Sequence, residues 1–72
     1  MSSGRPVKRS LTLRQHRTSV SLEDAFWKEF KAIAEKTGKT INGLAAEIDE
    51  ARGDVGLASA IRVFVLENLQ SR

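Results

Sequence analysis

Residues 10–20 constrain the fold of this chain most, because they have the pattern of a β-strand and are followed only by helical patterns. Ser10-Leu-Thr-Leu13 alternates polar and apolar residues, and Thr18-Ser-Val20 is rich in β-branched residues. A lone strand leaves backbone donors and acceptors unpaired on both edges. The segment therefore needs a partner strand, and its simplest source is the same segment of a second copy.

The two strand-like pieces are out of phase with each other. Leu11 and Leu13 fall on odd positions, whereas Thr18 and Val20 fall on even ones. Residues 14–17 therefore hold a bulge, a turn, or the end of one strand and the start of another. The sequence leaves these three alternatives open.

A first helix is expected over about residues 22–37. Ser21 with Asp24 three residues later fits a capping box, and Gly38 fits a left-handed residue that ends the helix. The apolar face of this helix consists of Phe26, Phe30, Ile33 and Ala34.

Two further helices are expected after Gly38. Thr40 can cap the second, which Gly53 would end, and Asp54 can cap the third, which would run to about Gln70. The apolar positions are Ile41, Leu44, Ala45 and Ile48 in the second helix and Leu57, Ile61, Phe64, Val65 and Leu69 in the third. The predicted fold class is mainly α with a short N-terminal β segment.

The chain cannot use the common covalent or metal supports of small domains. Its 72 residues allow one domain, they include no Cys, and His16 is the only His. Disulfides and zinc are therefore excluded, and we predict no cofactor and no metal site. Oligomerisation is the remaining common route to stability.

The basic charge is concentrated at the N-terminus. Residues 1–20 carry five Lys or Arg and no acid, whereas residues 21–72 carry seven Lys or Arg against nine Asp or Glu. We divide the chain into a flexible basic arm, residues 1–9, and a folded domain, residues 10–72. The arm is either aimed at a polyanion or a solvated tail that only aids solubility.

Enzymatic and membrane functions are not expected. The sequence has no Gly-rich phosphate loop, no metal-ligand set, no nucleophile with a plausible base, and too little chain for a pocket. It also has no apolar h-region and no apolar run near the ~20 residues that span a bilayer. A cytoplasmic location is therefore expected.

Several stretches resemble the Arc/MetJ class of ribbon-helix-helix proteins. One is Thr18–Leu22 ahead of a Phe/Ile-striped helix, and another is Gly38-Lys-Thr-Ile-Asn42 opening the next helix. A closer resemblance is to a bacterial subfamily of short ribbon-helix-helix proteins described as DNA-binding. It rests on His16-Arg-Thr-Ser-Val-Ser-Leu-Glu23, Phe26-Trp27, Ala46-Glu-Ile-Asp49 and Ser59-Ala-Ile-Arg-Val-Phe64, and it covers about residues 9–70.

The resemblance implies a homodimer with an intermolecular two-stranded antiparallel ribbon and an extra C-terminal helix. Such a ribbon fits the major groove of double-stranded DNA. The third helix departs from the minimal family pattern of one strand and two helices. Either the second or the third helix of this chain can therefore correspond to the second helix of the family.

The family reads bases with alternate outward residues of the strand. If Val20 points inward, counting back by two places Thr18 and His16 inward and Ser19, Arg17 and Gln15 outward. Arg17 then suits guanine, Gln15 suits adenine, and Ser19 is a less discriminating contact. The bland alternative is that Arg17 and Gln15 are solvated strand residues.

Phosphate contacts are assigned to two regions. Basic residues in and before the strand suit contacts that add affinity and salt dependence. The start of the second helix suits a phosphate because its backbone N–H groups are free, although an ordinary cap is also compatible with that sequence. The assigned residues are Arg5, Lys8, Arg9, Arg14, Lys39, Thr40 and Ile41.

The remaining residues are assigned to packing or to the dimer interface. Trp27 could stack on a base, but beside Phe26 it more often belongs to the core, and Arg62 is read as packing or surface charge. An acidic cluster, Glu47, Asp49, Glu50 and Asp54, is read as a solvated helix face. The core and dimer residues are Val20, Phe26, Trp27, Phe30, Ile33, Ile41, Leu44, Ile48, Leu57, Ile61, Phe64 and Val65.

These patterns predict a non-enzymatic, nucleoid-associated regulator. One alternative function is considered beside it. The main hypothesis is sequence-specific binding of double-stranded DNA as a homodimer, which represses or regulates transcription and leaves room for a higher oligomer on DNA. The alternative is a protein-interaction module, an antitoxin or adaptor, with secondary DNA binding. Because the third helix reaches almost to Arg72, we expect no partner-binding tail of the antitoxin kind.

Overall fold

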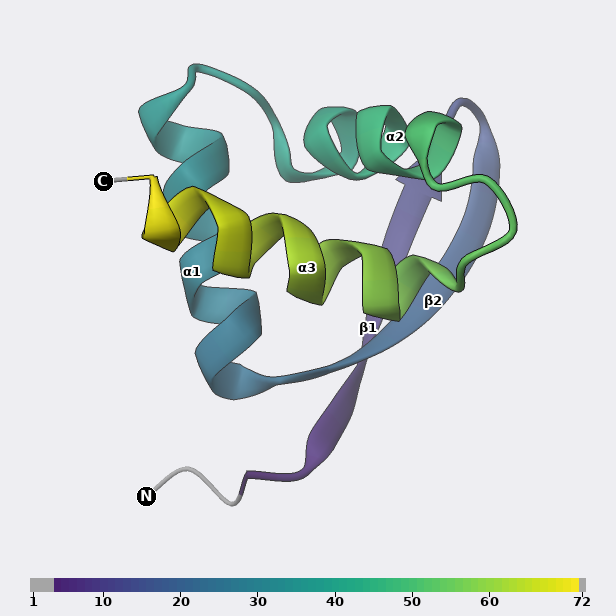
Figure 1. Ribbon diagram of the computed structural model, residues 1–72. Coiled ribbons are helices and arrows are strands. Elements are labelled where there is room, and N and C mark those ends of the chain that lie inside the picture. Colours follow the sequence, from purple (N-terminus) through teal and green to yellow (C-terminus); the bar gives the residue numbers. More distant parts are fainter. Residues whose placement is uncertain (1–3, 72) are drawn as a thin grey trace.

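The computed structural model describes residues 4–71 of the chain. The chain folds into a β-hairpin followed by three helices (Figure 1). The elements are β1 (Pro6–Leu13), β2 (His16–Glu23), α1 (Asp24–Lys36), α2 (Ile41–Ala51) and α3 (Leu57–Gln70). The predicted fold class, mainly α with an N-terminal ribbon and an extra C-terminal helix, is confirmed.

The ribbon forms within one chain. We expected the partner strand to come from a second copy, but β1 of the same chain pairs antiparallel with β2. The strand begins at Pro6, so residues 6–9 of the expected arm belong to the ribbon, and the arm's residues 1–3 lie outside the described residues.

A two-residue turn explains why the strand-like pieces are out of phase. Arg14 and Gln15 join the strands, and the register pairs Leu13 with His16 and Leu11 with Thr18, so odd positions of β1 face even positions of β2. Both turn residues have positive φ, 47° and 76°. This combination is typical of the type I′ turn, which usually contains Asn and Gly. Of the three alternatives, the turn is the one that forms.

The hairpin has an apolar inner face that packs on the helices. Residues directly opposite each other in an antiparallel pair share a face. Leu11, Leu13, Val20 and Leu22 therefore point the same way, and all four are buried. In Figure 1, α3 crosses the front of the molecule and β1 passes behind it. The helices thus cover one side of the ribbon and leave the other to solvent.

The start of α1 differs from the predicted capping box. Ser21 lies in β2 opposite Lys8, and the helix begins at Asp24 with Glu23 at the N-cap and no side-chain cap. The capping box is therefore wrong. Strand pairing competes here with helix formation. Because β1 begins at Pro6, it pairs with β2 as far as Glu23, and the residues from Ser21 to Glu23 stay extended.

The ends of the helices follow the sequence more closely. Gly38 adopts φ 70° after α1, and the Lys39 N–H donates to the Ala34 carbonyl at 2.8 Å, which is a Schellman motif. Thr40 caps α2, since its Oγ1 accepts from the Gly43 N–H at 2.9 Å. The N-cap of α3 is Gly56 without a side-chain cap, so the predicted Asp54 cap is wrong.

A single hydrophobic core joins the inner ribbon face to all three helices. Its largest fully buried side chains are Phe30, Leu22, Ile33, Ile61 and Val65. The core predicted from the sequence is placed there: Val20, Phe30, Ile33, Leu44, Ile48, Ile61 and Val65 are buried, and Phe26, Trp27, Ile41, Leu57 and Phe64 pack partly buried against them. Thr18 and His16, expected to point inward, are exposed, because they lie near the hairpin tip.

Two side chains tie the edges of the hairpin to the helices. In this register, alternate residue pairs direct their backbone groups outward to the free edges. The outward Thr12 N–H donates to Asn42 Oδ1 of α2 at 3.0 Å. On the other edge, Arg62 of α3 donates to the Ser21 carbonyl at 3.1 Å and to the Glu23 carboxylate at 2.9 Å. Arg62 is thus a latch between α3 and the end of the ribbon.

The hairpin turn is a site where one substitution should stabilise the fold. Left-handed backbone costs a residue with a Cβ roughly 1 kcal/mol more than it costs glycine. Gln15→Gly should therefore raise the free energy of unfolding by about 1 kcal/mol and the Tm by about 4–8 °C, measured by thermal unfolding. Gln15→Ala is the matched control and should give no such gain. An equal gain from both substitutions would contradict this geometry.

The latch should make stability depend on pH in the acid range. The Arg62 hydrogen bond, followed by the Glu23 backbone hydrogen bond, holds the pKa of Glu23 below its ordinary 4.5. Because the folded pKa is depressed, the stabilisation is present above about pH 4.5 and is lost as the pH falls through the folded-state pKa.

Chemical denaturation of Glu23→Gln across this range should therefore show a stability deficit relative to the native chain that shrinks as the pH falls. Arg62→Ala should remove the same component of the pH dependence, and the double variant should remove no more. A deficit that stays constant with pH would contradict the role of the latch.

Candidate nucleic-acid interface

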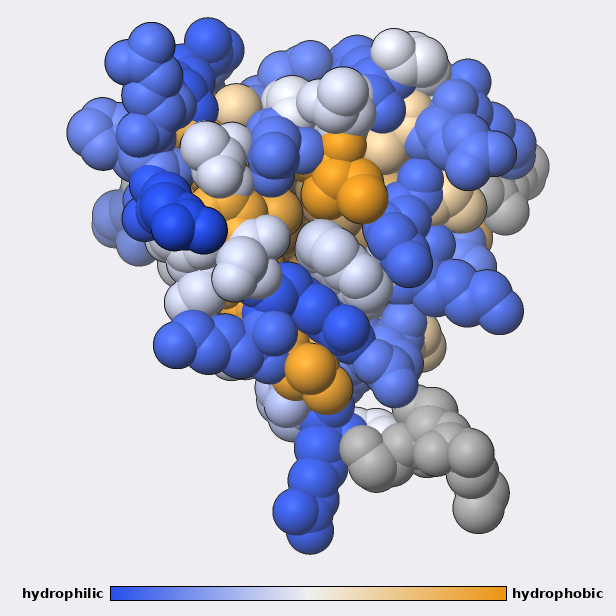
Figure 2. Space-filling view, turned by 180° about the vertical axis from the view of Figure 1, so that it is seen from behind, coloured by the Kyte–Doolittle hydropathy of each residue, from blue (hydrophilic) through white to orange (hydrophobic). Residues whose placement is uncertain are grey.

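The outer face of the hairpin is a solvent-exposed surface of small hydroxyl groups between two cations. Six residues form it, three from each strand, and all are exposed. They are the cross-strand pairs Lys8 with Ser21, Ser10 with Ser19, and Thr12 with Arg17. We call these six residues the ribbon face. Figure 2, which views the molecule from behind, shows a mostly hydrophilic surface with hydrophobic residues in separate patches.

The two cations of the ribbon face are available for an external ligand. Among residues 4–71, neither Lys8 nor Arg17 has an ion-pair or hydrogen-bond partner for its side chain. They lie near opposite ends of the ribbon, about 13 Å apart along the strand at the usual rise per residue. The small side chains between them leave both cations accessible.

The tip of the hairpin holds two of the predicted site residues. Gln15 was expected to alternate outward along the strand, but it occupies the turn, so the alternation of β2 ends at His16. Arg14 stands beside it, and its Nε donates to the Glu50 carboxylate of α2. Both side chains of this pair are more than half exposed. Gln15 therefore lies at the tip rather than on the ribbon face.

The start of α2 lies beside the Thr12 end of the ribbon face, because Asn42 binds the Thr12 N–H. Lys39 forms an ion pair with Glu47 at 2.8 Å, and Thr40 caps the helix. Ile41 is half-buried, so its side chain serves packing. Any phosphate contact at this end would come from the backbone and from Lys39.

Arg9 lies on the inner side of the ribbon, away from the ribbon face. Its side chain is 19% exposed, pairs with Asp24 at the start of α1, and places its guanidinium carbon 5.3 Å from the Trp27 ring centroid. These contacts fix Arg9 between ribbon and helix. Arg5 precedes β1 and is exposed. Of the predicted phosphate contacts, Arg9 is the one that the geometry turns inward.

The acidic cluster has a function that its sequence did not reveal. Glu47 and Glu50, read as a solvated face, bind Lys39 and Arg14, and Asp49 binds Arg52 at 2.6 Å. Two of the predicted phosphate contacts are therefore paired with carboxylates of α2. Because exposed ion pairs are worth at most about 1 kcal/mol, a phosphate can compete for these cations.

Half of the ribbon face was missed from the sequence. Ser10, Thr12 and Ser21 were not assigned, because β1 was not recognised as the partner of β2 and Ser21 was assigned to a helix cap. A signal was present: two alternating segments out of phase across a short polar gap indicate a two-residue hairpin. Arg17 and Ser19 were placed on the correct face by counting back from Val20.

Other kinds of site find no support in residues 4–71. No group of three or more His, Cys, Asp or Glu residues there could hold a metal ion. The helices of this part of the chain are each too short or too polar to cross a membrane.

A two-stranded antiparallel ribbon followed by helices defines the structural class of this chain. A family model described as "Ribbon-helix-helix domain" matches residues 6–69, and the chain therefore belongs to the ribbon-helix-helix family. Members of this family are generally DNA-binding transcription regulators or antitoxins, and they are typically non-enzymatic. Neither the curated proteins nor the solved structures contain a match to this chain.

Proposed function

We propose that this protein binds double-stranded DNA sequence-specifically as a homodimer and regulates transcription, most simply as a repressor. The ribbon face is the surface that enters the major groove, which admits a two-stranded β-ribbon. The observation that carries the proposal is that this face is exposed along its whole length and presents two cations without partners among residues 4–71. Family membership supports the same ligand.

Base reading is assigned to part of the ribbon face and to the tip of the hairpin. Arg17 can donate two hydrogen bonds to guanine O6 and N7, which is the commonest specific contact to a base. Ser19 and Thr12 flank it and can accept or donate at neighbouring bases. Gln15, at the tip of the hairpin, is proposed as a contact at the end of the ribbon, where adenine suits its amide.

Phosphate contacts surround this reading surface. Lys8 at the far end of the ribbon face, Arg5 before it, and Arg14 at the tip are proposed to contact the DNA backbone. Lys39 and the N-terminus of α2, with Thr40 and Ile41, form a second group next to Thr12. Since phosphate contacts supply affinity without sequence information, they position the ribbon face. We do not extend the proposal to Arg9, which faces inward.

Arg17→Ala tests the base contact. Duplexes retained from a random pool by the native chain should share a twofold-related motif. Loss of a bidentate contact costs about 1–3 kcal/mol, so Arg17→Ala should weaken binding to that motif about 5–150-fold and relax selection at one base pair. Lys31→Ala, an exposed cation of α1, removes the same charge away from the ribbon and is the control. Undiminished selectivity in Arg17→Ala would reject this role.

Glu50→Gln tests the competition between carboxylate and phosphate for Arg14. The substitution leaves Arg14 without its charged partner, so affinity for duplex DNA should rise about two- to threefold. The slope of log affinity against log salt should steepen by up to about one, because one more phosphate is neutralised. Glu35→Gln on α1 controls for the removed negative charge. If both variants behave alike, Arg14 does not contact DNA.

A further inference from the structure

The side chain of Asn42 joins the free edge of β1 to the start of α2. Thr12 and Arg17 lie opposite each other in a pair whose backbone groups point outward from the ribbon. The Thr12 N–H donates to Oδ1 of Asn42, the second residue of α2, at 3.0 Å. Asn42 therefore connects the ribbon to the helix at the level of Arg17.

The position of Arg17 depends on its backbone. Among residues 4–71 the Arg17 side chain has no ion-pair or hydrogen-bond partner that would orient it. The Cα atoms of an outward-pointing pair lie only about 4.5 Å apart, so a bond that holds Thr12 also limits the movement of the Arg17 backbone. The reach of the guanidinium toward a base edge starts from that backbone.

The start of α2 also carries one group of the proposed phosphate contacts. Lys39 and Thr40 precede Asn42 closely in the chain, and Thr40 caps the helix. Phosphate contacts fix the register of a protein on the duplex, whereas base contacts read the sequence. Asn42 lies between these two groups of contacts. Because a binding constellation works only when its members are held to within about 0.5 Å, a change at Asn42 would disturb their relative placement.

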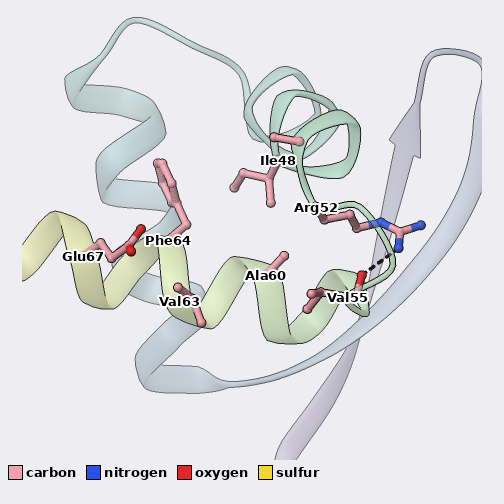
Figure 3. A pocket seen from close by; sticks show the side chains of 8 residues that line it. Ile48, Arg52, Val55, Ala60, Val63, Phe64 and Glu67 are labelled. Carbon is pink, nitrogen blue, oxygen red and sulfur yellow. Dashed lines mark hydrogen bonds between the residues drawn. The ribbon is translucent and has the colours of Figure 1, made fainter.

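The rest of the fold holds α2 without the Asn42 side chain. Ile48 is buried on the opposite side of the helix, and Figure 3 shows it facing Ala60 and Phe64 of α3. Asn42 itself is exposed, and the cap of α2 is supplied by Thr40. Removal of the Asn42 amide should therefore leave the helix in place and release only the edge of the ribbon.

We infer that Asn42 is a positioning residue for the proposed base contact. Its side chain holds the edge of β1 so that Arg17 reaches its base while the start of α2 lies on the DNA backbone. The inference rests on the proposed function, to which it adds a residue that determines specificity without touching a base. A direct contact of Asn42 to phosphate is the competing role, and it would require the amide to leave Thr12.

Amide hydrogen exchange tests the bond without DNA. In the native chain the Thr12 N–H should be more protected than the Ser10 N–H, which is the next outward-pointing amide of β1. Asn42→Ala should remove that difference, whereas Asn68→Ala on α3 should preserve it. Circular dichroism should show that both variants keep their helices. Equal protection of the two amides in the native chain would overturn the inference.

Base discrimination tests the consequence of the bond. It is the ratio of the affinities for the selected motif and for the same motif with the base pair of Arg17 replaced. Asn42→Ala should reduce this ratio about two- to tenfold, and Asn68→Ala should leave it unchanged. Asn42→Asp keeps an acceptor oxygen for the Thr12 N–H, so it should retain the ratio even though its charge weakens binding to every duplex. In Arg17→Ala, adding Asn42→Ala should cause no further loss of affinity for the motif.

The outcomes separate this inference from the proposed function. An equal loss of affinity for all duplexes in Asn42→Ala, with discrimination intact, would make Asn42 a phosphate contact and overturn the inference. Unchanged affinity and discrimination in this variant, while the native chain selects a motif, would also overturn the inference alone. A native chain that selects no motif would overturn the proposed function, and this inference with it.

Discussion

The pairing of β1 with β2 through the Arg14-Gln15 turn is the constraint on which the rest of the structure depends. It places four apolar side chains on one side of the ribbon and hydroxyl groups with two cations on the other. The first side supplies part of the core on which three helices pack, and the second side supplies the ribbon face. Stability and the candidate site therefore share one register, because a shift by one residue would exchange the two faces.

The helical part of this fold could be predicted because its signals are local. Thr40, Gly38 and the apolar spacing of α2 and α3 act within a few residues, so the cap of α2, the end of α1 and most core positions could be read directly. The start of α1 could not. Ser21 and Asp24 have the sequence of a capping box, but Lys8 of β1 pairs with Ser21 from 13 positions upstream (21 − 8 = 13) and holds Ser21 extended. Pairing partners of this kind are not visible in a local pattern.

The candidate site also contains residues that could be predicted from local sequence and residues that could not. Arg17 and Ser19 could be placed by alternation from Val20, whereas Ser10 and Thr12 depend on the register between strands. Charge alone also assigned too many phosphate contacts. Arg9 and Arg14 were both assigned from their charge, but Arg9 packs on the inner side against Trp27 and Arg14 lies at the exposed tip. The role of Arg62 could not be predicted from the sequence near it, since its three contacts are with β2 and the start of α1. Contacts between segments that are distant in the sequence decide where these arginine side chains lie.

A hairpin closed within one chain changes how the ribbon face responds to dilution. A ribbon made from two subunits exists only while the subunits are associated, so its population falls with protein concentration. Here the strands are joined by two residues, and their pairing is an intramolecular step of short loop closure. Dissociation of the proposed dimer would then leave each hairpin intact. Each chain keeps its ribbon face at any concentration, and only the proposed association of two copies depends on abundance.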